Sequence, residues 1–182
     1  YIGTIHGLCV KMLREDICSL RWPTRFFILS REDSAALLQA VADDQGAGWD
    51  KVKTDEALRQ IANRKKAEQD EYMTYLFDLS TEDLYERYRH ADSRADVIYY
   101  GFLYYQRKNY GLDYDDLILT ARNLLQRCED VRNKWMYRTE YIMVDEAQDL
   151  DDAQFELLRM LSGCYNNLML VGDPDQTLYG WR

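Results

Sequence analysis

The sequence predicts an α/β protein in which a parallel strand–helix–strand unit follows a long helical segment. Two short apolar runs, at 141–144 and 168–171, flank an amphipathic stretch at 155–161. Strand, helix and strand within about thirty residues are typical of a parallel βαβ unit with buried strands. Between residues 22 and 112, apolar residues instead recur at the spacing that places them on one face of a helix.

The N-terminal residues predict a strand followed by a helix. Residues 1–5 are apolar and rich in β-branched side chains, which favours a strand. Leu8, Met12 and Leu13 then follow at helical spacing within 6–20. A chain that begins inside a strand indicates a fragment of a longer protein.

Helix starts are expected at two places in the middle segment. Ser30 with Asp33, and Ser80 with Asp83, have the spacing of a capping box, in which each residue binds the backbone of the other. Residues 43–54 contain two glycines and read as a loop.

A helix around 58–62 is expected to end in a basic cluster, Arg64, Lys65 and Lys66. Such a cluster usually forms a solvated face. The alternative is that it contacts the phosphates of duplex DNA, as basic side chains do in nucleic-acid interfaces.

The next helix is expected to run from about Ala95 to a stop at Gly111, and Asp113 is expected to cap the helix after it. Five tyrosines between residues 99 and 110 either form a packing face or stack on bases. Their helical spacing favours packing. The apolar face of the helix after Asp113 comprises Leu117, Ile118, Ala121, Leu124, Leu125 and Cys128.

The composition is that of a globular chain, with 182 residues of which 47% are hydrophobic and 30% charged. No apolar run approaches the about 20 residues that span a bilayer, so no membrane partner is expected. The cysteines are far apart and include no C-x-x-C pair. This favours reduced thiols in a cytoplasmic protein over a disulfide framework or a zinc site.

The net charge of −9 argues mildly against a nucleic-acid-binding protein, because such proteins usually carry a basic surface. The acids, however, concentrate at the ends of the two apolar runs. Asp145 and Glu146 follow the first run, and Gly172 and Asp173 follow the second. In parallel sheets, ligands bind beyond the carboxyl ends of the strands, so these acids are expected at a ligand site.

Carboxylates at this edge are suited to Mg²⁺, which prefers hard oxygen ligands. In a phosphate-handling ATPase, one acid holds the ion and a neighbour orients and deprotonates the attacking water. The amide of Gln176, which follows the second run, is suited to contact a terminal phosphate. The alternative is that acids at strand ends only face solvent, but two neighbouring runs ending in acids favour the ATPase.

Four stretches carry the resemblance, and they lie along the chain in the order "IGTIHGLC", "GLDYDDLILTA", "YIMVDEAQDLDDAQFELL" and "NLMLVGDPDQTLYGWR". The last two resemble motifs II and III of the UvrD/Rep/PcrA family of superfamily 1 DNA helicases. The first resembles motif Ib, and the second resembles the acidic segment that precedes motif II. Motifs II and III are the specific signals, and the order and spacing of all four extend the resemblance to essentially the whole chain.

The resemblance implies part of a RecA-like parallel sheet of the P-loop NTPase type, interrupted by a large all-helical insert. Residues 1–21 and 113–182 would form the two segments of the RecA-like domain, and 22–112 the inserted helical subdomain. The parent would couple Mg²⁺-ATP hydrolysis to translocation on single-stranded DNA and duplex unwinding. Its partners would be ATP, single-stranded DNA, single-strand/duplex junctions and the remaining domains of the parent chain.

The resemblance also implies roles for motif residues at the nucleotide. Asp145 would be the magnesium ligand, Glu146 the general base for water, and Gln176 the contact to the γ-phosphate. Gln148 and Asp149 would couple motif II to its neighbours.

A second group of residues is implied at DNA. Thr4 and His6 would approach the DNA backbone. Tyr179 and Trp181 would lie towards single-stranded DNA, with Trp181 stacking on a base.

The given residues contain no G-x-x-x-x-G-K-[ST] phosphate loop. We therefore expect the isolated chain to be inactive as an ATPase. Two alternatives remain open for the parent: the motor portion of a helicase-nuclease subunit, or a non-catalytic module that binds DNA or a protein.

Overall fold

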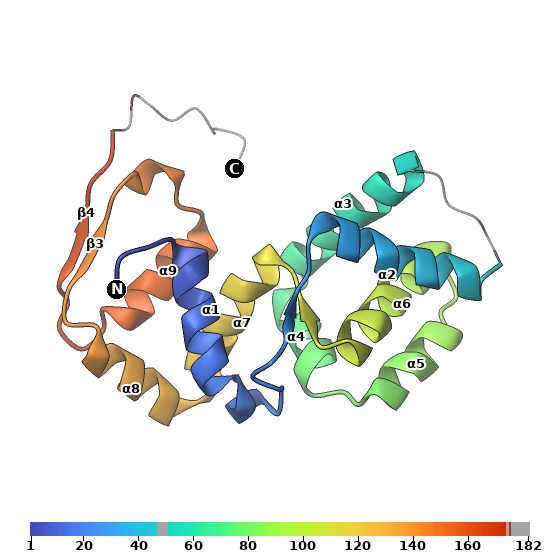
Figure 1. Cartoon of the computed structure of the whole chain (residues 1–182), viewed down its shortest axis with the longest axis horizontal. Helices are drawn as coiled ribbons and strands as arrows, with labels where there is room; N and C mark the ends of the chain where they lie inside the picture. The colour runs from blue at the N-terminus through green and yellow to red at the C-terminus, as the bar shows by residue number, and fades with distance from the viewer. Residues whose placement is uncertain (47–50, 174, 176–182) are drawn as a thin grey trace. The chain divides into compact units, whose positions relative to one another are not determined.

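The computed structural model describes residues 1–46, 51–173 and 175. The chain divides into two compact units. Unit 1 combines Tyr1–Ser19 with Leu117–Arg182, and unit 2 is Leu20–Asp116. Unit 1 is thus built from two stretches that are far apart in the sequence (Figure 1).

The βαβ unit expected near the C-terminal end is confirmed in unit 1. It consists of β3 (Ile142–Val144), α9 (Asp152–Leu161) and β4 (Leu168–Leu170), and the two strands pair in parallel. A short 3₁₀ helix, η2 (Ala147–Asp149), follows β3. The strand pair is coloured orange to red in Figure 1. A complete RecA-like sheet would need further strands, and the described residues of unit 1 supply this one pair.

The expectation of buried strands is wrong for one face of the pair. Ile142 is buried, whereas the next residue, Met143, is 78% exposed. Its register partner Met169 is 57% exposed. Because side chains alternate between the faces of a strand, the described residues cover only the face on which Ile142 lies.

The N-terminal strand expected at 1–5 is also wrong. Helix α1 (Ile5–Asp16) begins instead, and Thr4 is its N-cap, with a side-chain oxygen that accepts a hydrogen bond from Gly7 N at 3.1 Å. A threonine oxygen that satisfies a free amide of the first turn stabilises this helix start. The 3₁₀ helix η1 (Ile17–Leu20) follows α1.

Helices α7 (Tyr114–Arg127) and α8 (Glu129–Arg138) complete unit 1, although the first residues of α7 belong to unit 2. Charged contacts hold α1 to α8. The Asp16 carboxylate accepts hydrogen bonds from Lys134 Nζ and from Trp135 Nε1, both at 2.7 Å. Arg138 pairs with Glu15 at 2.7 Å.

Unit 2 contains five helices among its described residues: α2 (Arg31–Asp44), α3 (Lys51–Ala67), α4 (Gln69–Phe77), α5 (Thr81–Arg89) and α6 (Arg94–Lys108). Helix α6 packs against α2, α4 and α5. A glycine permits this close packing, since a Cβ on Gly101 would lie 2.8 Å from the Tyr88 ring and 2.9 Å from a methyl of Val41.

The insert is expected to be all-helical, and this expectation is wrong, because unit 2 also contains a pair of short strands. Strands β1 (Phe27–Ile28) and β2 (Gly111–Leu112) pair in parallel. Gly111 therefore lies in a strand and does not terminate α6. The residue that leaves the helical path is Tyr110, with φ of 49°.

The predicted caps are confirmed. Ser30 with Asp33 and Ser80 with Asp83 each form a complete capping box. Asp113 accepts a hydrogen bond from Asp116 N at 2.9 Å at the start of α7. The loop expected at 43–54 is shorter than predicted, because α2 continues to Asp44 and α3 begins at Lys51.

The basic cluster at the end of α3 is only partly solvated, since Lys65 is 2% exposed whereas the Lys66 side chain is 65% exposed. Arg64 pairs with Asp96 at 2.7 Å and lies over the Tyr99 ring. Tyr99 is itself buried, as the packing interpretation requires, whereas Tyr110 is 44% exposed.

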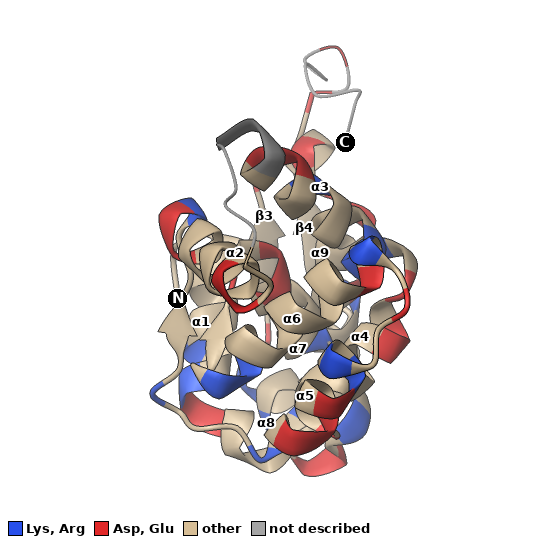
Figure 2. Ribbon diagram, turned by 90° about the vertical axis from the view of Figure 1, so that its right-hand side faces the viewer, with Lys and Arg blue, Asp and Glu red and all other residues tan. Residues whose placement is uncertain are grey.

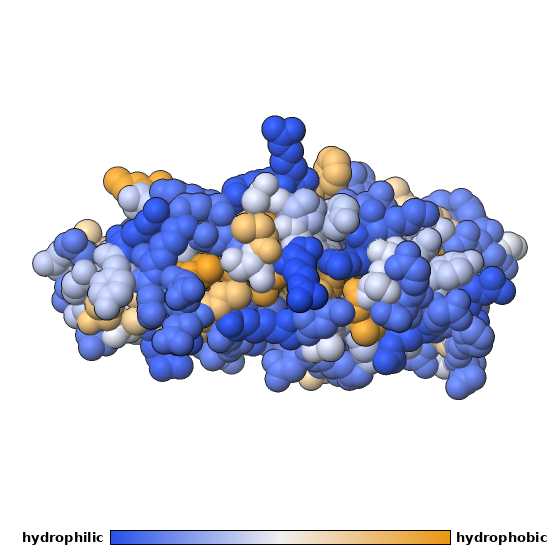
Figure 3. Space-filling model, turned by 90° about the horizontal axis from the view of Figure 1, so that it is seen from below, coloured by the Kyte–Doolittle hydropathy of each residue, from blue (hydrophilic) through white to orange (hydrophobic). Residues whose placement is uncertain are grey.

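Both basic and acidic residues lie along the helices that face the viewer in Figure 2. On the face in Figure 3, hydrophilic residues predominate and hydrophobic ones form small groups. Among the described residues, no helix is both long and apolar enough to cross a membrane.

Candidate active site

The predicted acids lie at one edge of the strand pair in unit 1. Because β3 and β4 are parallel and in register, their carboxyl ends meet at the same edge. Backbone hydrogen bonds continue past the strands: Val171 N donates to Val144 O at 2.8 Å, and Ala147 N donates to Val171 O at 2.9 Å. The segments that carry Asp145 and Asp173 are therefore held side by side.

Asp145 is the first residue after β3, and its side chain is exposed. One carboxylate oxygen accepts a hydrogen bond from Glu146 N at 3.0 Å. This bond orients the carboxylate while the group stays open to solvent. An exposed, oriented carboxylate is suited to bind a cation.

Glu146 has a left-handed backbone conformation, with φ of 55° and ψ of 41°. Few residues other than glycine adopt this conformation, and those that do often lie at functional sites. The turn is closed by Asp149 N, which donates to Glu146 O at 3.0 Å. The conformation directs the chain from β3 into η2 and leaves the Glu146 side chain exposed.

Gln148 joins the two segments through its side-chain amide. Its Nε2 donates to Glu146 Oε2 at 2.5 Å, and its Oε1 accepts from Asp173 N at 3.1 Å. One amide thus orients the carboxylate after β3 and holds the backbone after β4. Asp149 is half-buried in η2.

Gly172 is required by this arrangement, and the sequence reasoning did not identify its role. A Cβ at this position would collide with Gln148 Oε1 and would lie 3.1 Å from the backbone nitrogens of Ala147 and Gln148. A glycine directly after an apolar run is the signal that could have revealed the close approach. Beyond it, Asp173 Oδ1 accepts from Asp175 N at 3.0 Å.

No cluster of three or more His, Cys, Asp or Glu side chains is arranged to hold a metal ion within residues 1–46, 51–173 and 175. Magnesium does not need such a cluster, because it commonly binds through one or two carboxylates, waters and substrate phosphates. Asp145 fits that mode, since its carboxylate is exposed beside the end of a strand.

Thr4 and His6 lie at the start of α1, in unit 1. The Thr4 hydroxyl is used in the helix cap, and the Tyr1 hydroxyl donates to Thr4 O at 3.2 Å. His6 is half-buried. Gln176, Tyr179 and Trp181 lie outside the described residues.

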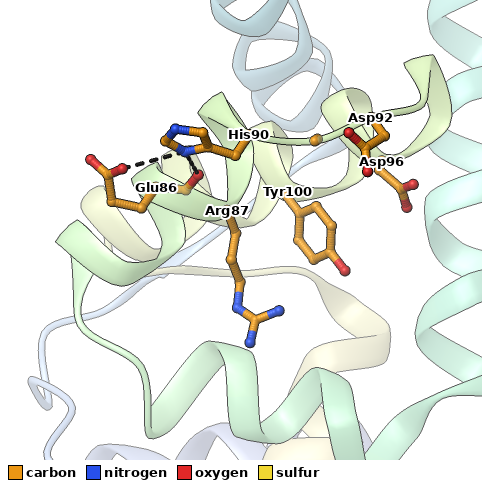
Figure 4. Close-up of a pocket in the computed structure, with 7 residues that line it drawn as sticks. Glu86, Arg87, His90, Asp92, Asp96 and Tyr100 are labelled. Carbon is orange, nitrogen blue, oxygen red and sulfur yellow. Dashed lines mark hydrogen bonds and ion pairs between the residues drawn. The ribbon is translucent and has the colours of Figure 1, made fainter.

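A separate pocket of about 530 Å³ lies within unit 2 and contains none of the predicted site residues. Figure 4 shows Arg87, His90 and Tyr100 among its lining side chains. His90 Nδ1 lies 3.4 Å from a Glu86 carboxylate oxygen. The pocket is lined by acidic side chains (Glu86, Asp92 and Asp96) and by the basic Arg87, which favours no single class of charged ligand.

The comparisons with known proteins agree with the motif resemblance. The UvrD/REP helicase N-terminal domain model matches residues 1–182. The chain is 30% identical over 184 aligned positions to the ATP-dependent DNA helicase PcrA of Staphylococcus aureus. It is 29% identical to the protein of the same name from Staphylococcus epidermidis.

These alignments cover 100% of the chain but 24% of each relative. The chain thus spans about a quarter of the length of the curated relatives it matches. Since the family model extends over the complete sequence, the chain belongs to the UvrD/REP helicase family and corresponds to its N-terminal domain.

Proposed function

We propose that the chain is part of an ATP-dependent DNA helicase, in which the acids after β3 take part in the binding and hydrolysis of Mg²⁺-ATP. The observation that carries the proposal is the joined edge of the strand pair. There, Asp145 and Glu146 stand beside the Asp173 segment, and Gln148 contacts both sides. Ligands of parallel α/β sheets bind at this edge.

Asp145 would hold the magnesium ion of the nucleotide. Its carboxylate supplies the hard oxygen ligand that this ion prefers. When bound, the ion neutralises charge on the phosphates.

Glu146 would act as the general base that takes a proton from the attacking water. A base must be held within hydrogen-bonding reach of its proton, so its orientation matters as much as its charge. Gln148 Nε2 donates to one Glu146 oxygen, which leaves the other oxygen for water. Gln148 and Asp149 would couple this proton transfer at Glu146 to the segment after β4.

Gln176 would contact the γ-phosphate at the far end of that segment. Thr4, His6, Tyr179 and Trp181 would contact single-stranded DNA, and a single-strand/duplex junction would be the substrate of the parent. These assignments rest on the family motifs.

Unit 1 would be part of the RecA-like domain, and unit 2 would be the inserted subdomain. We propose that residues 1–21 and 113–182 belong to the former and 22–112 to the latter. The isolated chain would hydrolyse no ATP above background, because the phosphate-loop lysine and amides that hold the β- and γ-phosphates are supplied by none of its 182 residues.

The decisive variant is Glu146→Gln in the full-length parent. Glutamine keeps an oxygen that accepts from Gln148, so the local structure should persist while the base is lost. We expect ATP binding to remain and DNA-stimulated ATP hydrolysis to fall by at least about 10²-fold. The matched control is Glu140→Gln, which removes the same charge just before β3 and should leave hydrolysis unchanged. Near-normal turnover of Glu146→Gln would exclude Glu146 as the base.

A further inference from the structure

The acidic segment before motif II, "LDYDD" at residues 112–116, has no part in the function proposed above. Its first and last acids nevertheless meet a lysine inside unit 2. Lys65 Nζ lies 2.7 Å from Asp113 Oδ2 and 3.0 Å from Asp116 Oδ1. The Lys65 side chain is 2% exposed and the Asp116 side chain is 0% exposed, so this ion pair is removed from water.

Asp116 is the centre of a wider hydrogen-bond network. Its carboxylate accepts from the Tyr72 hydroxyl at 2.6 Å, from Gln106 Nε2 at 2.5 Å and from Asp113 N at 3.0 Å. With Lys65 included, the donors come from α3, α4, α6 and the turn before α7. A buried carboxylate is stable only when its oxygens are satisfied in this way.

Asp113 has two tasks in the same network. Its Oδ1 accepts from Asp116 N at 2.9 Å and caps the first turn of α7. Its Oδ2 accepts from Lys65 at 2.7 Å. The cap of α7 is thereby tied to α3, which is 48 residues earlier in the chain.

We propose that Lys65, Asp113 and Asp116 form a buried ionic lock that fixes the start of α7 to α3, α4 and α6, and that this lock responds to protons through Asp116. The lock contains two carboxylates and one ammonium group. When all three are ionised, one negative charge is left without a partner in a buried site.

The groups that face Asp116 explain where the proton goes. They are Lys65 from α3, Tyr72 from α4, Gln106 from α6 and Asp113 from its own turn. Burial, followed by the neighbouring Asp113 carboxylate, raises the pKa of Asp116 to about 6. Burial raises the pKa of Asp113, but the charge and hydrogen bond of Lys65, together with the hydrogen bonds to Asp116, outweigh it and leave that pKa lowered.

The sign of the pH effect follows from this difference. Since the pKa of Asp116 is above its ordinary value in the folded chain, its protonation stabilises the fold at low pH. That contribution is lost as the pH rises through about 6. Asp113 has the opposite effect, but its lowered pKa places that effect at more acidic pH.

The first test compares Lys65→Met with Lys66→Met in the 182-residue chain by thermal unfolding. Lys66 is the matched control, because its side chain is 65% exposed and its ion pair with Asp115 is 3.9 Å long. Removing one partner of a buried pair leaves an uncompensated charge, and we expect Lys65→Met to lower Tm by about 6–20 °C. Equal Tm values for the two variants would overturn the proposal.

The second test measures the pH dependence, which a purely structural role would not alter. Between about pH 5 and pH 7, the Tm difference between wild type and Asp116→Asn should change with pH, since only the wild type has the buried acid. Tyr72→Phe removes one hydrogen bond that favours the ionised form of Asp116. In this variant, the pH at the midpoint of the stability change should therefore be higher than in the wild type. A constant difference, or an unmoved midpoint in Tyr72→Phe, would refute the proton response.

If Lys65→Met does not fold, the double variant Lys65→Met/Asp116→Asn replaces it. Removing both charges avoids the uncompensated carboxylate of Asp116, so the lock predicts that the double variant is more stable than Lys65→Met alone. Additive losses would overturn the proposal. None of these measurements involves ATP or DNA, so their outcome is independent of the helicase assignment.

Discussion

Replacing Gly172 with alanine tests the joined edge at which the candidate acids lie. A Cβ there would collide with Gln148 Oε1 and would lie 3.1 Å from two backbone nitrogens. The amide could move, but both backbone nitrogens belong to η2 and could not move without breaking the bond from Ala147 N to Val171 O. Both segments after the strands would have to separate.

The expected cost follows from these contacts. Overpacking of one methyl group typically costs about 1–3 kcal/mol. Displacing Gln148 also forfeits its hydrogen bonds to Glu146 and to Asp173 N. Each of these hydrogen bonds is worth about 0.5–1.5 kcal/mol. Because their loss would relieve the same collision that causes the overpacking, the two costs are alternatives and do not sum. For a chain of this size, about 1–3 kcal/mol corresponds to a fall in Tm of about 2–12 °C.

The assay is thermal unfolding of the 182-residue chain, followed by circular dichroism. Gly163→Ala is the control in the same unit, because its Cβ would meet the methyl end of Met136, a side-chain type that adapts easily, at 3.2 Å and one backbone oxygen at 3.3 Å. It should lower Tm by less than Gly172→Ala. In a Gln148→Ala background, the cost of Gly172→Ala should shrink, since one of the colliding atoms is absent. An unchanged Tm for Gly172→Ala would show that the two segments do not approach as described.

Three further outcomes are expected. Ser80→Ala should cost about 1 kcal/mol in urea unfolding because it removes the cap of α5, and a neutral result would mean that the capping box contributes nothing. Iodoacetamide should label the exposed Cys18 well before the buried Cys9, because burial raises the pKa of the Cys9 thiol to about 12; peptide mass spectrometry would reveal the reverse order. Asp16→Asn should cost about 1–3 kcal/mol because it weakens charge-assisted bonds from α8, including that of Trp135, and unchanged urea unfolding would contradict this.

Features encoded by neighbouring residues were predictable from the sequence. The capping boxes at Ser30 and Ser80 each depend on a residue three positions later. The βαβ unit follows from two apolar runs and the helix between them. For the candidate site, the residues indicated the acids at the strand ends, and the family resemblance implied that Gln148 couples motif II to its neighbours. The atoms that Gln148 contacts, Glu146 Oε2 and Asp173 N, depend on side-chain rotamers and could not be predicted.

Features that depend on distant residues were missed. Lys65 was expected in solvent because its neighbours Arg64 and Lys66 are also basic, and its partner Asp113 is 48 residues away. The strand predicted at 1–5 failed for a different reason. Thr4 has a side chain that suits both a strand and a helix cap, and its hydrogen bond to Gly7 N decides for the cap.

Because Glu146 has a left-handed backbone, the amino acid that is most stable at this position differs from the one that activity would require. A residue with a side chain pays about 1–2 kcal/mol for this conformation, and glycine does not. A screen for thermostable variants should therefore enrich glycine or asparagine at position 146, although both lack a carboxylate. A screen for turnover should retain the glutamate if it is the base. The amino acid found at this position after laboratory evolution would thus report which property the population had been selected for.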